Sequence, residues 1–314
     1  MVKESLMQIK PYLRHGMSET LTVAMCSPLT NLEDKSANLD KFIRWTKEAA
    51  ARGVDLISFP ELALTGYQLT EPGEPSVLYD VAETIPGPSV NRLIDAAKQN
   101  NIYIVMGMYE ADTEYVGMLY NTAVFVGPEG LVGKYRKLTI ESWGSYEMNK
   151  NGVGGGHEIP VWEIRQGWRI GIIICLDMWV PEIPRIEVLK GADLIVVISA
   201  GPVGTEENWI HVNRIRAIEN TTGFTYCNLA GDEHGFRFFG GRMAVEAGGE
   251  VLVPMEGSAD KEGMAIATFS AEKLYNARKT VPALIRDRNP AAYQRLVDPE
   301  RHMPDFIPYR GKKG

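Results

Sequence analysis

The sequence predicts an α/β fold in which helices cover β-sheets on at least one face. Short, very apolar runs alternate along the chain with longer segments whose apolar residues recur at helical spacing. The composition, with 45% hydrophobic and 23% charged residues in 314, is that of a globular protein with a large core. Because no Ser/Gly-rich linker divides the chain, we expect a single domain over residues 1–314.

The first half contains strand and helix patterns in alternation. A helix is expected at 36–52, where Leu39, Phe42 and Ile43 share one face, and another at 89–99, after a Pro-Gly-Pro turn. The strand at 55–59 stops at Pro60, which cannot donate a ladder hydrogen bond. The expected strands of this half are 21–26, 55–59, 102–109 and 120–126, the last two forming a hairpin.

The second half repeats this rhythm with longer aliphatic runs. Helices are expected at 183–190 and 209–221, where apolar residues again recur every three or four positions. The expected strands are 160–164, 169–175, 192–198, 223–228, 242–246 and 264–269. From about residue 281 to 314 the chain becomes rich in Arg, Asp, Pro and Tyr. This C-terminal extension is either a surface extension or an arm that packs on a partner subunit.

Charge and cysteine content exclude several classes of protein. A net charge of −7 and a pI near 5.4 argue against nucleic acid or an anionic membrane as the main partner. Charged residues interrupt positions 1–20, and no apolar run is long enough to span a bilayer, so we expect a cytoplasmic protein. Three widely spaced cysteines, an odd number, argue against disulfides and structural zinc.

Three segments carry residues with chemical potential, although each has an ordinary structural interpretation. Glu61 follows a buried strand, where active-site residues often lie, but a loop carboxylate is commonly only solvated. Lys137 ends a Lys-Tyr-Arg-Lys stretch that would usually be a basic surface turn. Cys175 ends an apolar strand, where a sharp turn can expose its sulfur, whereas Cys26 and Cys227 lie within strands and are expected to be inert.

In combination, these segments resemble the nitrilase, or carbon–nitrogen hydrolase, superfamily. The resemblance rests on a Glu after a strand that ends in Pro, a Tyr-Arg-Lys turn, and a Cys-x-Asp that is followed by Pro-Glu. Further matching stretches are Arg216-Ala-Ile-Glu-Asn, Asn228-Leu-Ala-Gly and a Pro-x-x-Tyr element near Tyr293. The order and separation of all these motifs agree from about residue 21 onward. The chain departs from the family at Cys26-Ser27 and at Thr139-Ile140.

The resemblance implies a fold, a mechanism and an assembly. It implies a four-layer α-β-β-α sandwich that forms a homodimer or a larger homo-oligomer, with no cofactor and no metal. Glu61 would act as general base, Cys175 as nucleophile, and Lys137 together with the backbone N–H of Leu176 would bind the oxyanion. A second glutamate would position substrate; Glu147 and Glu141 compete for this role, and we favour Glu147.

The residues after the nucleophile narrow the expected substrate. By resemblance, Asp177 favours an amide over a nitrile, and Met178-Trp179 argues against a substrate that carries a carboxylate. We therefore expect a thiol amidohydrolase acting on a small amide or carbamoyl amine, with an apolar, aromatic pocket. Its expected walls are Tyr67, Trp143, Leu176, Trp179 and Ala200. The alternatives are a nitrilase, a non-catalytic binding homologue, and an acyltransferase or ammonia-channelling glutaminase module.

One further cluster, Asp232-Glu233-His234, contains residue types that bind metals. It lacks a second histidine at helical spacing and any cysteine partner. We interpret it as a solvated loop.

Overall fold

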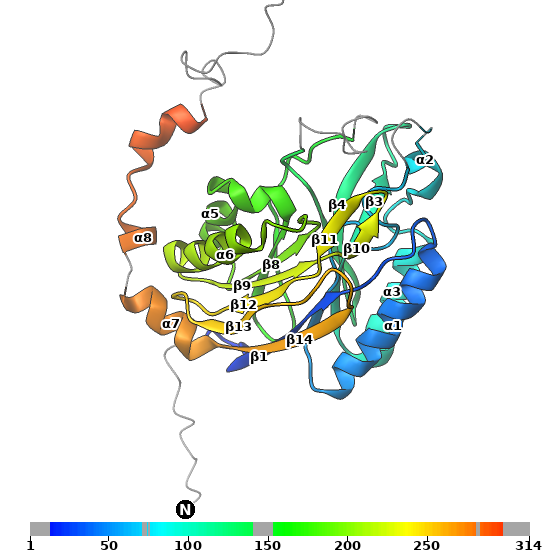
Figure 1. The fold of residues 1–314 in the computed structure, drawn as a ribbon. Coiled ribbons are helices and arrows are strands. Elements are labelled where there is room, and N and C mark those ends of the chain that lie inside the picture. Colours follow the sequence, from blue (N-terminus) through cyan, green and yellow to red (C-terminus); the bar gives the residue numbers. More distant parts are fainter. Residues whose placement is uncertain (1–12, 71–73, 75, 141–152, 281–282, 298–314) are drawn as a thin grey trace, which may run out of the picture.

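The computed structural model describes residues 13–70, 74, 76–140, 153–280 and 283–297. Two six-stranded sheets pack face to face, and helices cover their outer faces (Figure 1). This arrangement confirms the predicted α/β fold with its α-β-β-α layers. Burial dictates it, because both faces of the central strands are apolar and each sheet needs a cover on either side.

The first sheet has the strand order β14-β1-β2-β3-β4-β5, with β1, β2 and β3 parallel and the outer pairs antiparallel. Helices α1 (Lys35–Ala51) and α3 (Pro88–Asn100) pack on its outer face, and the short α2 (Leu78–Val81) lies near β3. Its strands are β14 (Gly263–Ser270), β1 (Thr20–Ser27), β2 (Leu56–Ser58), β3 (Tyr103–Ala111), β4 (Leu119–Gly127) and β5 (Gly130–Arg136).

The second sheet has the same plan, with the strand order β13-β12-β9-β8-β7-β6 and a parallel centre of β7, β8 and β9. Helices α5 (Glu182–Leu189) and α6 (Glu206–Asn220) lie over its outer face in Figure 1. Its strands are β13 (Val251–Glu256), β12 (Arg242–Val245), β9 (Gly223–Asn228), β8 (Leu194–Ser199), β7 (Arg169–Ile174) and β6 (Val161–Glu163).

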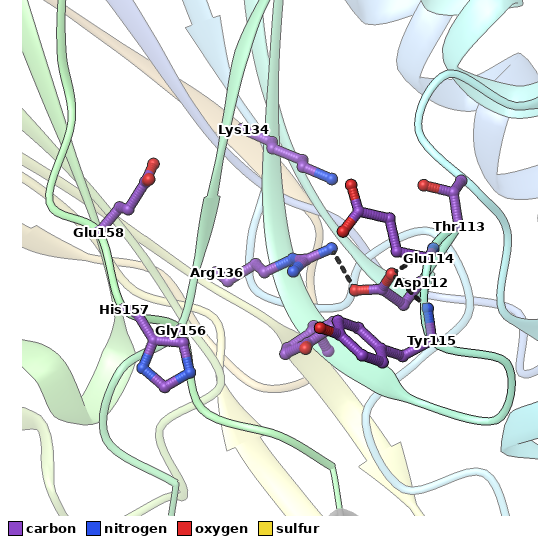
Figure 2. Close-up of a pocket in the computed structure, with 10 residues that line it drawn as sticks. Asp112, Thr113, Glu114, Tyr115, Lys134, Arg136, Gly156, His157 and Glu158 are labelled. Carbon is purple, nitrogen blue, oxygen red and sulfur yellow. Dashed lines mark hydrogen bonds and ion pairs between the residues drawn. The ribbon is translucent and has the colours of Figure 1, made fainter.

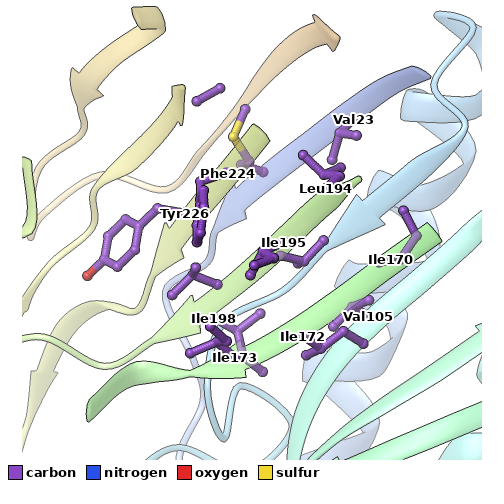
Figure 3. Packing of buried hydrophobic residues seen from close by; sticks show 14 of the residues in the cluster. Val23, Val105, Ile170, Ile172, Ile173, Leu194, Ile195, Ile198, Phe224 and Tyr226 are labelled. Atoms are coloured by element: carbon purple, nitrogen blue, oxygen red, sulfur yellow. The ribbon is translucent and has the colours of Figure 1, made fainter. Parts of the chain in front are cut away.

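The main core lies between the two sheets. Val23 and Val105 of the first sheet belong to the same buried cluster as Ile172, Ile195 and Phe224 of the second (Figure 3). Each of these side chains is fully buried, and burial of one such residue stabilises the fold by about 1.5–3 kcal/mol. A second cluster joins the first sheet to α1 and α3.

Several elements were not expected from the sequence. β5 and β13 both lie at sheet edges; β5 contains two glycines and two cations, and Pro254 interrupts β13, so neither has the pattern of a central strand. β10 (Ala230–Glu233) and β11 (Phe236–Phe239) form a separate two-stranded hairpin. The expected strands and helices are otherwise present, with ends shifted by a few residues.

The described C-terminal elements follow β14 along the chain. They are α7 (Ala271–Thr280), α8 (Ala283–Arg286) and the 3-10 helix η2 (Pro290–Leu296). α8 contacts α6, whereas η2 is exposed along its length. None of the described helices combines the length and the apolar character that crossing a bilayer requires.

Asp193, which precedes β8, joins the start of the described chain and α7 to the second sheet. Its buried carboxylate accepts hydrogen bonds from Arg14, from Arg278 of α7 at 3.1 Å, and from the backbone N–H of Arg169 at 3.0 Å. Removing a buried charge from such a cluster leaves its partners uncompensated.

We predict that Asp193→Asn lowers the free energy of unfolding by about 2–3 kcal/mol, somewhat less than for a fully buried pair because both arginines are partly exposed. Asp260→Asn, which breaks the exposed Arg237–Asp260 pair, should cost less than about 1 kcal/mol. Urea unfolding of the two variants checks this. Equal losses would contradict it.

Candidate active site

Glu61 lies three residues past the end of β2, on a turn that passes directly over β3. The backbone at Leu62 is left-handed, with φ of 52°. A Cβ atom on Gly107 of β3 would lie 2.4 Å from the Leu62 nitrogen and 2.5 Å from the Pro60 oxygen, so only glycine allows this approach. Glu61 itself is completely buried.

Lys137 follows β5, and strand alternation explains its burial. Lys134 and Arg136 point to one face of the strand, where both form ion pairs with Glu110. Lys137 points to the opposite face and is completely buried. Its Nζ lies 2.8 Å from Oε1 of Glu61, which also accepts a hydrogen bond from Nδ2 of Asn121 at 2.7 Å. The surface-turn interpretation is therefore wrong: the stretch ends a strand, its first two cations are half-buried in ion pairs, and Lys137 is completely buried.

Cys175 lies where β7 ends and the 3-10 helix η1 (Cys175–Trp179) begins. Its φ of 46° is left-handed, a rare conformation for a non-glycine residue that turns the side chain sharply out of the strand. The turn is held from α6, since Arg216 donates from Nε to the carbonyl of Met178 at 3.1 Å. All three cysteines are thiols, and Cys175 has 9% of its surface exposed, whereas Cys26 and Cys227 have none.

A pocket of about 200 Å³ opens beside Cys175. Among the described residues, none that line it carries a charged side chain. It contains four of the five predicted wall residues, Tyr67, Leu176, Trp179 and Ala200. Its remaining lining residues are Gly201, Pro202, Thr205, Asn208 and Trp209. The fifth predicted wall, Trp143, lies outside the described residues, as do Glu147 and Glu141.

Two further observations concern the position of Cys175 relative to the Glu61–Lys137 pair. Burial raises the pKa of Tyr226 well above its ordinary value, and the charges of Cys175 and Glu61 raise it further, so both groups lie within electrostatic range of this phenol. Asp177, two residues after Cys175, accepts hydrogen bonds from the backbone N–H groups of Leu138 and Thr139, which follow Lys137. The turn that carries Cys175 in the second sheet is therefore hydrogen-bonded, through Asp177, to the chain just after Lys137 in the first.

Two asparagines shape the site through contacts that the sequence did not predict. Asn121 of β4 contacts Glu61 directly. The Asn228 side chain closes the Ala200–Pro202 turn of the pocket wall, accepting from the N–H of Gly201 at 2.6 Å and donating to its carbonyl at 2.9 Å. Asn121 lies 60 residues from Glu61, and Asn228 lies 27 residues from Gly201, so no local pattern marks these contacts.

The prediction of a solvated loop at Asp232-Glu233-His234 is wrong for Glu233. This carboxylate is 2% exposed and accepts hydrogen bonds from the backbone N–H groups of Tyr67 and Gln68 at 2.8 and 2.9 Å, and from the Thr30 hydroxyl. Burial raises the pKa of Glu233, and these donors partly offset the effect. The hairpin β10–β11 thus fixes the loop that carries the Tyr67 wall.

A larger cavity of about 520 Å³ lies on the opposite face of β5. Figure 2 shows Arg136 pointing across it to Asp112, 2.9 Å away. Arg136 also stacks over the Tyr120 ring, and Lys134 pairs with Glu110, so these cations are already neutralised within the protein. Among the described residues, no group of three or more His, Cys, Asp or Glu side chains could hold a metal ion.

Comparisons with known proteins agree on one family. The family model for carbon-nitrogen hydrolase matches residues 22–279. A probable nitrilase of Schizosaccharomyces pombe is 28% identical over 85% of this chain and 94% of its own, and a nitrilase of Pyrococcus abyssi is 32% identical over 73% and 82%. A formamidase of Bacillus cereus is 30% identical over 76% of this chain and 70% of its own.

Solved structures share the fold at lower identity. Nit3 of Saccharomyces cerevisiae superposes with a TM-score of 0.72 at 22% identity, covering 87% of this chain and 98% of its own. An amidase variant from Nesterenkonia sp. AN1 has a TM-score of 0.71 at 22% identity, over 87% and 95% of the two chains. That structure carries the acetamide moiety of fluoroacetamide on its active-site cysteine.

The burial of the three thiols predicts their reactivity. Cys175 lines a pocket, whereas Cys26 and Cys227 are enclosed, and burial raises the pKa of Cys227 to about 12 and that of Cys26 well above its ordinary value. We expect iodoacetamide to modify Cys175 in the folded protein and the other two only after unfolding, as measured by peptide mass spectrometry. Equal labelling of all three in the native state would contradict this assignment.

Proposed function

Because the chain belongs to the carbon–nitrogen hydrolase family, we propose that it is a thiol amidohydrolase that cleaves the C–N bond of a small amide or carbamoyl amine. The observation that carries this proposal is that Cys175 lies on a small pocket while its turn is hydrogen-bonded, through Asp177, to the chain beside Lys137, which pairs with the completely buried Glu61. A nucleophile, a base and an oxyanion-binding cation are what acyl transfer through a thioester requires.

In the first step, Glu61 accepts the proton of Cys175 and the sulfur attacks the carbonyl carbon. The C=O bond becomes a C–O⁻, which Lys137 Nζ and the backbone N–H of Leu176 stabilise. Each such donor contributes about 3 kcal/mol when it is pre-positioned for the oxyanion. The intermediate collapses with cleavage of the C–N bond, and the nitrogen leaves as ammonia or an amine with the proton that Glu61 held.

In the second step, Glu61 takes a proton from water, whose oxygen attacks the thioester. Cleavage of the C–S bond returns the thiol and releases a carboxylic acid, or a carbamic acid from a carbamoyl amine. One carboxylate can serve in both steps because Glu61 returns to its ionised form each time it gives up the proton that it has accepted. The net reaction consumes one water for each amide.

The size and the lining of the pocket support a small substrate without a carboxylate. Its volume of about 200 Å³ lies below the range of about 300–1,000 Å³ that is usual for drug-sized ligands. Trp179 and Trp209 form an aromatic wall, with ring centroids 5.4 Å apart. Among the described lining residues, none offers a cation that would compensate a substrate carboxylate.

A nitrile is the second candidate substrate, favoured by the nitrilases among the relatives. The same thiolate would attack the nitrile carbon, and hydrolysis to the acid and ammonia would consume two waters. We rank it second because Asp177, two residues past the nucleophile, resembles the amidase pattern.

We predict that the wild-type protein releases ammonia from formamide, acetamide or a carbamoyl amine faster than from acetonitrile or propionitrile. Cys175→Ala should abolish turnover, and Glu61→Gln should lower kcat by about 10²–10⁴-fold, the usual contribution of an acid–base group. Coupled ammonia assays measure the rates, and mass spectrometry after acid quenching detects the acyl group on the Cys175 peptide.

Glu110→Gln is the matched control, since Glu110 is also a buried carboxylate paired with a lysine but faces the opposite side of β5. It should leave kcat within a few-fold of the wild type. Turnover of nitriles without amides would overturn the substrate class, and full activity of Cys175→Ala would overturn the mechanism.

We also propose that the chain forms a homodimer through the α5–α6 face, which we define as Trp179, Ile186, Leu189, Ile215 and Ile218. These large apolar side chains are each 37–47% exposed on one helical layer. An exposed apolar cluster of this kind is typical of a protein–protein interface, and a two-fold axis would pair it with itself.

We predict that Ile215→Glu weakens this dimer, because the carboxylate would lose its hydration in the interface. Sedimentation velocity across a concentration series measures the effect. Val116→Glu, on the fully exposed β3–β4 turn, is the control and should sediment as the wild type. A monomeric wild type, or an Ile215→Glu dimer of unchanged affinity, would refute the proposed interface.

A further inference from the structure

Asp177 is a buried carboxylate two residues past Cys175 that does not line the pocket. None of its surface is exposed, and it is absent from the described residues around the 200 Å³ pocket. Its position in η1 ties it rigidly to the nucleophile, because only one residue separates them within a single 3-10 turn.

Three hydrogen bonds link this carboxylate to the chain around Lys137. Oδ2 accepts from the Tyr135 hydroxyl at 2.6 Å and from the Leu138 N–H at 3.2 Å, and Oδ1 accepts from the Thr139 N–H at 2.7 Å. One donor precedes Lys137 and two follow it. The bonds therefore bracket Lys137 and join the end of β5 to the end of β7, strands of different sheets.

The backbone of Lys137 has anchors of its own, but these come from the chain segments beside it. Its N–H donates to the carbonyl of Asn121 on β4 at 2.8 Å, and its carbonyl accepts from the Gly156 N–H at 2.8 Å. Neither bond reaches the turn that carries Cys175. Asp177 thus joins the chain around Lys137 to the turn that carries Cys175.

The charge of Asp177 suits this role. Burial raises the pKa of Asp177, whereas the hydrogen bond from Tyr135 and the charge of Lys137 lower it. All three bonding partners are donors, so both side-chain oxygens of Asp177 have to act as hydrogen-bond acceptors. An asparagine would place an NH₂ group against one set of donors, which leaves at least one buried N–H or O–H without its acceptor.

We propose that Asp177 is a positioning residue, which sets the distance between the Cys175 sulfur and Lys137 Nζ and so places the oxyanion-binding cation for attack. This proposal rests on the proposed function, because it assigns Lys137 a catalytic task. A displacement of about 1 Å in such a constellation can lower the rate about 10²-fold while binding of substrate changes little.

The test is Asp177→Asn, with Tyr135→Phe as a graded variant that removes one of the three bonds. We expect Asp177→Asn to lower kcat about 10²-fold with KM nearly unchanged, and Tyr135→Phe to lower it by about tenfold or less. The rate at which iodoacetamide alkylates Cys175 should fall in the same order, because a displaced lysine stabilises the thiolate less.

Asp193→Asn separates positioning from stability. Asp193 is another buried, multiply bonded carboxylate, but it contacts Arg14, Arg169 and Arg278 and none of the pocket residues. It should lose stability and keep the kcat and the alkylation rate of the folded wild type. A similar loss of kcat in Asp193→Asn and Asp177→Asn at equal folded fraction would overturn the proposal, as would wild-type kcat in Asp177→Asn.

Failure of the proposed function has a different signature. If the wild type hydrolyses neither amides nor nitriles, the proposed activity is wrong. The alkylation series and crystal structures of the wild type and Asp177→Asn still decide the positioning role. An unchanged alkylation rate together with an unchanged sulfur-to-Nζ distance would then refute it.

Discussion

The fold is organised around one buried ion pair, Glu61 with Lys137. Neither side chain has any exposed surface, and an isolated charge in such a place would cost several kcal/mol. The pair persists because strand order brings its members together: β2 delivers the carboxylate, β5 delivers the cation, and Asn121 of the intervening β4 donates to the same oxygen. Gly107 of β3 completes the arrangement by letting the Glu61 turn approach.

Much of this architecture can be predicted from sequence, because the central strands are strongly apolar. The Ile- and Val-rich runs of β7 and β8 indicate strands buried on both faces, and these strands form the middle of the second sheet. β5 and β13 escape prediction because each contains residues that are unusual in a central strand: two glycines and two cations in β5, and Pro254 in β13. Their pairing with β4 and β12 identifies them as edge strands.

The candidate site also combines residues that the sequence predicts with contacts that it does not. Glu61 and Cys175 are marked locally, since each follows an apolar run that ends abruptly, and the order of their motifs indicates the family. The supporting contacts are not marked locally. Asn121, Asn228 and Glu233 bind groups 27 to 203 residues away, and only the three-dimensional fold shows that Glu233 fixes the loop that carries the Tyr67 wall. The alternation of β5, with Tyr135 and Lys137 facing inward, is visible in sequence once β5 is assigned as a strand.

The left-handed backbone of Cys175 places reactivity and folding in direct conflict at one position. A β-carbon in this conformation costs about 1–2 kcal/mol, most of which glycine would recover. The polypeptide would therefore tolerate heat better without Cys175, its proposed nucleophile, than with it. Laboratory selection for thermal stability alone would favour glycine at this position. A screen for more thermostable variants therefore has to select for catalytic turnover in every round.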